Sequence, residues 1–297
     1  MHRGRASSRS SAGRLSAADL AGMLAAMRRS VCASLLGLLL LVASPAWAHD
    51  YWLEFSPRTP RQGDLLSLSL WVGEDFAAHE QKAMEIERTL SLQHLSSAGD
   101  EDLRPLAHEG AAPIVKLTLR EPGGHLLALE RTPARISMRA LKFNRYLKHE
   151  GLRAAFAERK RSGERFQRAR ERYTRYLKAF VQVGAAADGL STRVLGHRIE
   201  LVPERDVATA RAGERLALQV RFEGEPLAGV MVEAFVRDAA GKPQGQQRFS
   251  DGKGRVEFTL GQRGAWLVRT VHMQRCIGCD DAEWESFWAA YSFSLGQ

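Results

Sequence analysis

The chain has 297 residues, of which 44% are hydrophobic and 26% charged, and it carries a formal net charge of +9. The first 48 residues hold six arginines and one aspartate, so the rest of the chain keeps 37 basic and 33 acidic residues and a net charge of only +4. A charge this small argues against a nucleic-acid partner, and about 250 residues suffice for two domains with separate cores.

An export signal occupies the start of the chain. Residues 31–43, VCASLLGLLLLVA, form an apolar run that follows two arginines and precedes an Ala-Trp-Ala sequence. The run has the length of a signal-peptide hydrophobic region and is too short for a membrane-spanning helix, and the two alanines match the residues that signal peptidase reads. We therefore predict that residues 1–48 are removed and that the mature, periplasmic protein begins at His49 and has no transmembrane segment.

The mature chain begins with strand patterns. DYWLEF follows His49 directly, and LLSLSLWVG (65–73) and PIVKLTLRE (113–121) alternate apolar and polar residues, as half-buried strands do. From about residue 140 to residue 178 the apolar residues recur at near-helical spacing instead, with a break near Ser162-Gly163. This stretch predicts two short helices, whose many basic side chains could meet an acidic partner or phospholipid, or form a solvated face.

After residue 196 the strand pattern returns and continues to the end of the chain. Segments such as ERLALQVRF, GRVEFTL and FWAAYSFSL are separated by turns and not by helices, which is typical of antiparallel sandwiches. We expect a mainly β protein of two antiparallel β-sandwich domains of the immunoglobulin or prealbumin type. The expected domains are residues 49–195, with a helical insertion at about 140–178, and residues 196–297.

Five segments together carry a resemblance to a known family. They are AHDYWLEF, RERYTRYLKAFVQVG, GHRIELVP, PLAGVMVEAF with DGKGRVEFTL, and WLVRTVHM followed by WESFWAAYSFSL. In this order they resemble the periplasmic family filed as domain of unknown function 4198, often described as nickel or cobalt transport-associated. The resemblance implies an exported β-rich protein associated with uptake of a transition metal.

A histidine at the first position of a mature chain is a chelator by itself. The α-amine and the ring Nδ1 of His49 can bind one metal ion together, and one further imidazole would complete a histidine brace, as in copper monooxygenases. The amine titrates near 8 and the ring near 6.5, so both can bind at neutral pH. Such ligands suit Cu(II), Ni(II) and Zn(II). The open alternative is that the histidine follows the cleavage site by chance.

The remaining His and Cys residues include further candidate ligands. His272 is the preferred partner of His49, and His197 is a possible accessory, because both lie in segments that match the family. Cys276 and Cys279 follow His272 in a C-x-x-C sequence, which could bind metal, act as a redox dithiol or close a disulfide in an oxidising periplasm.

Other histidines rank lower as ligands. Glu74, Asp75 and His79 form a second plausible ligand set at the end of a strand. The stretches around four further histidines are polar, so solvated side chains are expected there; these are His94, His108, His125 and His149.

The sequence thus predicts a periplasmic protein that binds nickel, cobalt or copper and passes it to an inner-membrane transporter. Catalytic motifs are absent: no nucleophile elbow, zincin motif, phosphate loop or dinucleotide fingerprint occurs, so no enzyme is expected. Two alternatives remain. One is an envelope β-sandwich module that binds another protein or a glycan without metal, and the other is a copper oxidase built on His49.

Overall fold

The structure is a computed structural model that describes residues 50–184, 187–237 and 240–296. These residues belong to one compact unit. The expected signal peptide, residues 1–48, and His49 lie outside the described residues. Of the helices in the described part, none is long and apolar enough to cross a membrane.

Strands dominate the described residues. In the first half they are β1 (Asp50–Ser56), β2 (Leu65–Glu74), β3 (Ala77–Lys82), β4 (Thr89–Ser96), β5 (Gly99–Asp102), β6 (Val115–Thr118), β7 (Gly123–Arg131), β8 (Ala134–Met138) and β9 (Ala169–Val183). In the second half they are β10 (Ile199–Pro203), β11 (Arg215–Phe222), β12 (Glu225–Pro226), β13 (Met231–Arg237), β14 (Pro243–Phe249), β15 (Arg255–Thr259), β16 (Gly264–Arg275) and β17 (Trp284–Leu295). The helices are α2 (Ala140–His149) and α3 (Arg153–Arg161), with 3-10 turns η1 (Ile86–Arg88), η2 (Arg104–Leu106), η3 (Glu164–Phe166), η4 (Leu190–Thr192) and η5 (Val207–Thr209).

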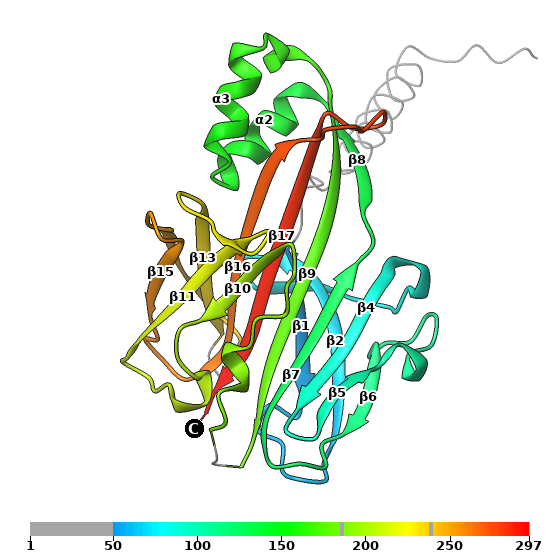
Figure 1. The fold of residues 1–297 in the computed structure, drawn as a ribbon, viewed down its shortest axis with the longest axis vertical. Coiled ribbons are helices and arrows are strands. Elements are labelled where there is room, and N and C mark those ends of the chain that lie inside the picture. The colour runs from blue at the N-terminus through cyan, green and yellow to red at the C-terminus, as the bar shows by residue number, and fades with distance from the viewer. Residues whose placement is uncertain (1–49, 185–186, 238–239, 297) are drawn as a thin grey trace, which may run out of the picture. The chain divides into compact units, whose positions relative to one another are not determined.

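A nine-stranded sheet forms the centre of the molecule (Figure 1). Its strand order is β14-β13-β16-β17-β9-β7-β4-β5, and β8 also pairs with β9. The long strands β9 and β17 pair in parallel from Glu171 opposite Trp284 to Phe180 opposite Phe293, whereas the other pairs in this sheet are antiparallel. The centre of the sheet therefore joins a strand from the first half of the chain to the last strand.

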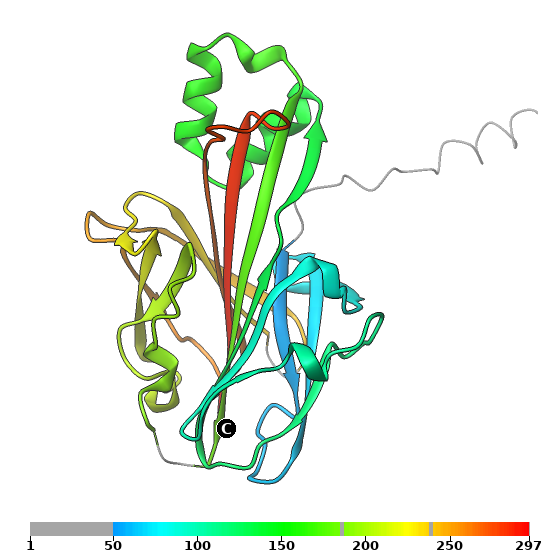
Figure 2. The same cartoon turned by 45° about the vertical axis from the view of Figure 1, so that its right-hand side comes forward.

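Both faces of this sheet are covered, which explains why its central strands are buried along nearly their whole length. Strands β1, β2, β3 and β6 form a smaller sheet over one face, and strands β10, β11, β12 and β15 form another over the opposite face (Figure 2). Side chains alternate between two cores along each central strand: Leu177 and Ala179 of β9 pack with the first small sheet, and Tyr176 and Phe180 pack with the second.

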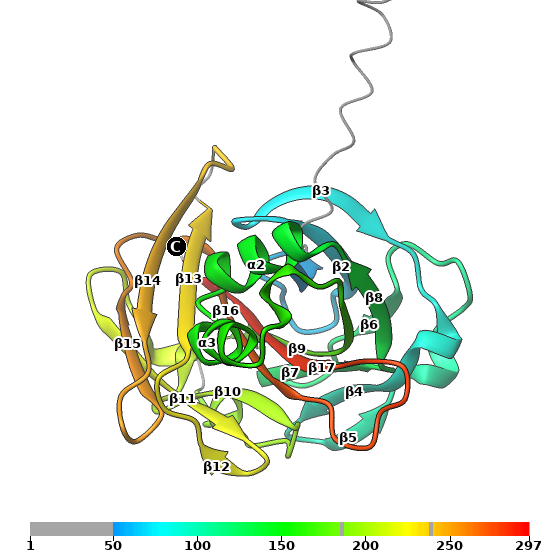
Figure 3. The ribbon, with the colours of Figure 1, turned by 90° about the horizontal axis from the view of Figure 1, so that it is seen from above.

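The two helices cover one end of the central sheet (Figure 3). Phe143, Tyr146 and Leu147 of α2 are buried against Trp284 and Trp288 of β17 in a third core. The residues that β9 and β16 contribute to this third core are odd-numbered, like those that they contribute to the core under the first small sheet. The third core and the first small sheet therefore lie on the same face of the central sheet.

The mainly β, sandwich-like fold with a short helical insertion is confirmed. The predicted helical stretch ended too late, because residues 169–178 form the first part of β9. The break between the two helices lies at residues 150–152 and not near Ser162-Gly163. The segment pairs with β7, β8 and β17, so cross-strand hydrogen bonds decide its conformation. The two halves of the chain on either side of the expected boundary near residue 195 both contribute strands to the nine-stranded sheet.

Candidate functional site

A buried arginine gathers three carboxylates at the start of β1. Arg269 lies on β16, with Nε 2.9 Å from Asp50 Oδ1, Nη1 2.6 Å from Glu150 Oε2 and Nη2 2.5 Å from Glu233 Oε2. Asp50 begins β1, Glu150 follows the last residue of α2, and Glu233 lies opposite Arg269 on β13. Three distant parts of the sequence therefore meet at the residue that follows His49, and we call these four residues the Arg269 cluster.

The Arg269 cluster contains three carboxyl groups and one guanidinium. Burial raises the pKa of Asp50 to about 7, even though Arg269 opposes the shift and the neighbouring Glu150 and Glu233 add to it. Burial also raises the pKa of Glu233. Glu150 differs, because Arg269 and His149 outweigh its burial and hold its pKa below the usual value. One guanidinium thus faces three carboxylates, and an additional cation nearby would stabilise their ionised forms.

The turn between β2 and β3 lies next to the cluster. Asp50 pairs with Gly73 of β2, and the charge of Asp75 in the turn contributes to the raised pKa values of Asp50 and Glu233. Asp75 and Phe76 have φ values of 51° and 64°, an uncommon conformation for residues with side chains. The buried ring of Phe76 lies 5.3 Å from that of Trp52, an edge contact that holds the turn against β1.

A glycine is required where β2 bends toward this turn. A Cβ atom on Gly73 would lie 1.9 Å from the carbonyl oxygen of Ala77 and 2.9 Å from the Trp52 ring. The register between β2 and β3 also shifts at Val72 and Gly73. The close approach at Gly73 therefore fixes the position of the turn relative to β1.

Two imidazoles and a pocket border the same region. His79 is exposed on β3, one residue beyond Ala78, which pairs with Gly73. His149 ends α2, and its Nδ1 lies 3.0 Å from Glu150 Oε1, a contact that raises the pKa of His149. A pocket of about 400 Å³ is lined by Asp75 and Glu233, together with residues of β13 and β14. The predicted ligand set of Glu74, Asp75 and His79 therefore lies near Asp50, the residue that follows His49.

The described residues alone do not complete a metal site. Among them no group of three or more His, Cys, Asp or Glu side chains is placed to hold a metal ion. The carboxylates of Asp50, Glu150 and Glu233 already contact Arg269, so their suited role is to balance the charge of a nearby cation. A transition metal fits this region if His49 supplies the primary ligands and an imidazole at the border, such as His79, adds another.

The two histidines preferred from the sequence lie on the other face of the central sheet. His272 is three residues from Arg269 on β16, so their side chains point to opposite faces. The His272 ring packs on Phe222 of β11, with centroids 4.6 Å apart, and burial lowers its pKa. The His197 ring lies 5.3 Å from that of Tyr176, and burial lowers its pKa to about 4. Neither side chain faces the Arg269 cluster.

Cys276 and Cys279 form a disulfide, which was one of the three alternatives that the sequence left open. The bond closes the loop between β16 and β17. In this state the two sulfur atoms are not thiolates and do not act as metal ligands.

The prediction of solvated side chains was wrong for His94 and His125. Both are buried, on β4 and β7, and His94 Nε2 lies 2.8 Å from His125 Nδ1. His125 Nε2 donates to the carbonyl oxygen of Glu121 at 2.9 Å, which leaves Nδ1 to accept from His94. Burial lowers the pKa of both rings, so this pair belongs to the packed core. His108 is exposed, as expected.

Sequence reasoning missed the members of the Arg269 cluster. The available signal was a charged residue within an apolar strand, as Arg269 is in GAWLVRTVHM and Glu233 is in MVEAFVRD. Such a residue either faces solvent or pairs with an opposite charge in the core, and only the tertiary contacts separate the two cases.

Comparison with known proteins identifies one family. Residues 46–274 match the family described as Domain of unknown function (DUF4198). No curated protein matches the chain. Among solved structures, the D0-D1 domain of Intimin aligns at 11% identity over 82% of this chain and 97% of that chain, with a TM-score of 0.18. A score this low supports no argument about fold or function.

Proposed function

This chain belongs to the DUF4198 family, whose description assigns no function, and we propose from its own residues that it binds a transition metal ion in the periplasm. In this proposal the ion is nickel, cobalt or copper, the processed His49 supplies the α-amine and ring Nδ1, and the recipient is an inner-membrane transporter. One observation carries the proposal: Asp50, the residue next to His49, is buried with two further carboxylates against a single guanidinium.

The fold would prepare His49 for this role in two ways. Asp50, to which His49 is bonded, is held by its pairing with Gly73 and by its contact with Arg269. The surplus negative charge lowers the energy of a cation at this position, since a charge that is only partly screened interacts over several ångströms. The metal would supply Lewis acidity or simply be cargo, while the carboxylates balance its charge.

The position of the cluster changes the expected partner of His49. His79 lies on the hairpin beside Asp50, whereas His272 lies on the opposite face of β16. We therefore propose His79 ahead of His272 as the additional imidazole.

The test uses protein purified from the periplasm, so that the mature N-terminus is read in the same experiment. Native mass spectrometry with Ni, Co, Cu and Zn supplied in turn gives both the processed mass and the bound ion. An additional Ala placed ahead of His49 leaves the ring but displaces the amine. Affinity should then fall by at least about 10 to 100-fold, the loss expected even for an outer-shell partner.

Three substitutions locate the second ligand. His79→Ala should weaken binding, while His272→Ala should leave it unchanged, and His108→Ala is the matched control because that side chain is exposed and away from the cluster. Loss of binding in His272→Ala but not in His79→Ala would contradict the proposed location. Unchanged binding after the Ala insertion would place the metal site elsewhere and contradict the proposed role of His49. A parent protein that carries no metal would favour the metal-free envelope module, and oxygen consumption with a reductant that the insertion abolishes would favour the oxidase.

A further inference from the structure

The helical end of the molecule carries a local excess of positive charge. Residues 139–170, which include α2, α3 and η3, contain 11 basic and 3 acidic residues. The other residues after the predicted cleavage site contain 26 basic and 30 acidic residues. A net charge of +8 is therefore concentrated in a short segment of a chain that is otherwise slightly acidic.

Three large apolar side chains are exposed on the elements of this end. Leu141 of α2 is 66% exposed, Phe166 of η3 is 85% exposed, and Ile277 in the loop between β16 and β17 is 91% exposed. Both helices and the tip of the β16–β17 hairpin lie together at one end of the central sheet (Figures 1 and 3). Each apolar residue stands on a separate turn or helix end.

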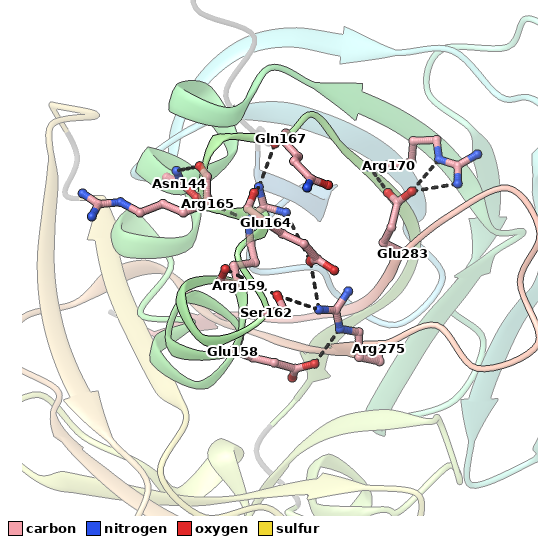
Figure 4. A network of polar contacts seen from close by, with 10 residues as sticks. All are labelled: Asn144, Glu158, Arg159, Ser162, Glu164, Arg165, Gln167, Arg170, Arg275 and Glu283. Carbon is pink, nitrogen blue, oxygen red and sulfur yellow. Dashed lines mark hydrogen bonds and ion pairs between the residues drawn. The ribbon is translucent and has the colours of Figure 1, made fainter.

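Hydrogen bonds from two neighbouring side chains hold the turn that carries Phe166. The buried Arg159 donates from Nη2 to the carbonyl oxygens of Glu164 and Gln167, both at 2.8 Å, and Asn144 Nδ2 donates to the carbonyl oxygen of Arg165 at 2.8 Å (Figure 4). These bonds satisfy the backbone on both sides of Phe166. The exposure of the ring is thus a fixed feature of the turn, which reduces the entropy lost on contact with a partner.

The hairpin that carries Ile277 is attached to the same framework. Arg275 of β16 contacts Glu158 Oε1 at 2.5 Å and Glu164 Oε2 at 2.9 Å, and Arg170 Nε donates to Glu283 Oε1 at 2.8 Å (Figure 4). The Cys276–Cys279 disulfide closes the loop beyond these contacts. Phe166 and Ile277 therefore project from one cross-linked assembly.

Several basic side chains at this end have no charged partner. Arg145, Lys160 and Arg161 are exposed, and within the part of the chain that the structure describes none of them forms an ion pair. Some exposed arginines elsewhere are paired, as Arg193 is with Asp100 at 2.7 Å. The unpaired charges are thus available to an anionic surface.

We propose that the helical end, defined by residues 139–170 and the β16–β17 loop, docks on an anionic phospholipid surface. The loop adds Asp280, Asp281 and Glu283, so the helical end holds 11 basic and 6 acidic residues and keeps a net charge of +5. Isolated apolar side chains on convex tips can enter the boundary between headgroups and acyl chains, and the basic side chains between them attract the headgroup phosphates. A folded acidic protein would instead need a continuous complementary patch of roughly 800 Å² on each side. Docking of this kind is independent of the metal site at Asp50.

Vesicle sedimentation with the processed protein tests the proposal. The protein should bind vesicles of phosphatidylcholine mixed with phosphatidylglycerol, and should bind less as salt is raised; phosphatidylcholine vesicles alone should bind weakly. Replacing Lys160 and Arg161 together with Gln should lower the partition coefficient about 25-fold, since each basic residue near the surface contributes about fivefold. Phe166→Ser should lower it by about tenfold or more.

The matched control is Leu65→Ser, which removes an exposed leucine at the start of β2, outside the helical end. Thermal unfolding of each variant shows whether its fold is intact, and Phe166 is too exposed for its loss to disturb the core. Equal binding of Phe166→Ser, Leu65→Ser and the parent would overturn the proposal. Absence of binding to anionic vesicles would also overturn the proposal, whether or not a purified acidic protein binds the same end.

Discussion

Replacing Glu171 with Gln should stabilise the protein at neutral and alkaline pH. Glu171 lies on β9 and is almost completely buried; it accepts hydrogen bonds from Tyr146 Oη at 3.0 Å and from Ser286 Oγ, while its Oε2 has no partner. Burial raises its pKa from 4.5 to about 7, although both hydrogen bonds oppose the shift. Gln keeps the accepting oxygen and removes the charge.

The magnitude follows from proton linkage. A carboxyl group whose pKa is higher in the folded state stabilises the fold below its unfolded pKa, and this contribution is lost as pH rises from about 4.5 to about 7. At pH 8 the ionised Glu171 therefore costs about 3 kcal/mol relative to a neutral side chain of the same shape. For a chain of this size, that corresponds to a rise in Tm of roughly 6 to 12 °C in Glu171→Gln.

Thermal unfolding of parent and variant from pH 4 to pH 8 measures this effect. The two melting temperatures should coincide at pH 4 and separate as pH rises, and Glu225→Gln, at an exposed position on β12, should follow the parent throughout. A Glu171→Gln protein that is less stable at pH 8, or a difference that does not depend on pH, would refute the assignment of a buried carboxyl group that ionises near neutrality.

Two further predictions concern buried polar pairs. His125→Ala should destabilise the protein by about 2 to 4 kcal/mol, because it leaves a cavity and an unpaired His94 Nε2. Urea unfolding measures this loss, and an unchanged stability would mean that the two rings are solvated. Lys178→Met should lower stability by about 3 to 5 kcal/mol, because Glu200, whose Oε1 lies 2.9 Å from Lys178 Nζ, would remain charged and buried. Adding Glu200→Gln should restore part of the loss, and a double variant as unstable as the single one would contradict this explanation.

Alternation of apolar and polar residues was a reliable guide to the strands. LLSLSLWVG became β2, and the segments GAWLVRTVHM and FWAAYSFSL became parts of β16 and β17. These patterns succeed because a pleated strand presents every second side chain to the same core. The β9 segment misled the prediction, since RERYTRYLKAF fits a helical period as well as a strand. Pairing with β7 and β17, which lie far away in sequence, decided between the two.

The candidate site was less accessible to sequence reasoning. His49 drew attention through its position after the cleavage motif, but nothing local shows that Asp50 meets Glu150 and Glu233 on Arg269. The preference for His272 rested on its sequence neighbourhood and took no account of the face to which its side chain points. Ion pairs between residues that are dozens to hundreds of positions apart leave no periodic trace.

The sequence by itself determined the class of this protein: a mainly β chain with a basic helical insertion, and a C-x-x-C pair close enough to form a disulfide. These features depend on local chemistry, namely periodicity, charge density and spacing. Only the tertiary structure decided that the two halves share one sheet, that His94 and His125 are core residues, and that three carboxylates converge on Arg269. Those outcomes depend on parallel pairing of β9 with β17 and on burial, which arise only when distant strands come together.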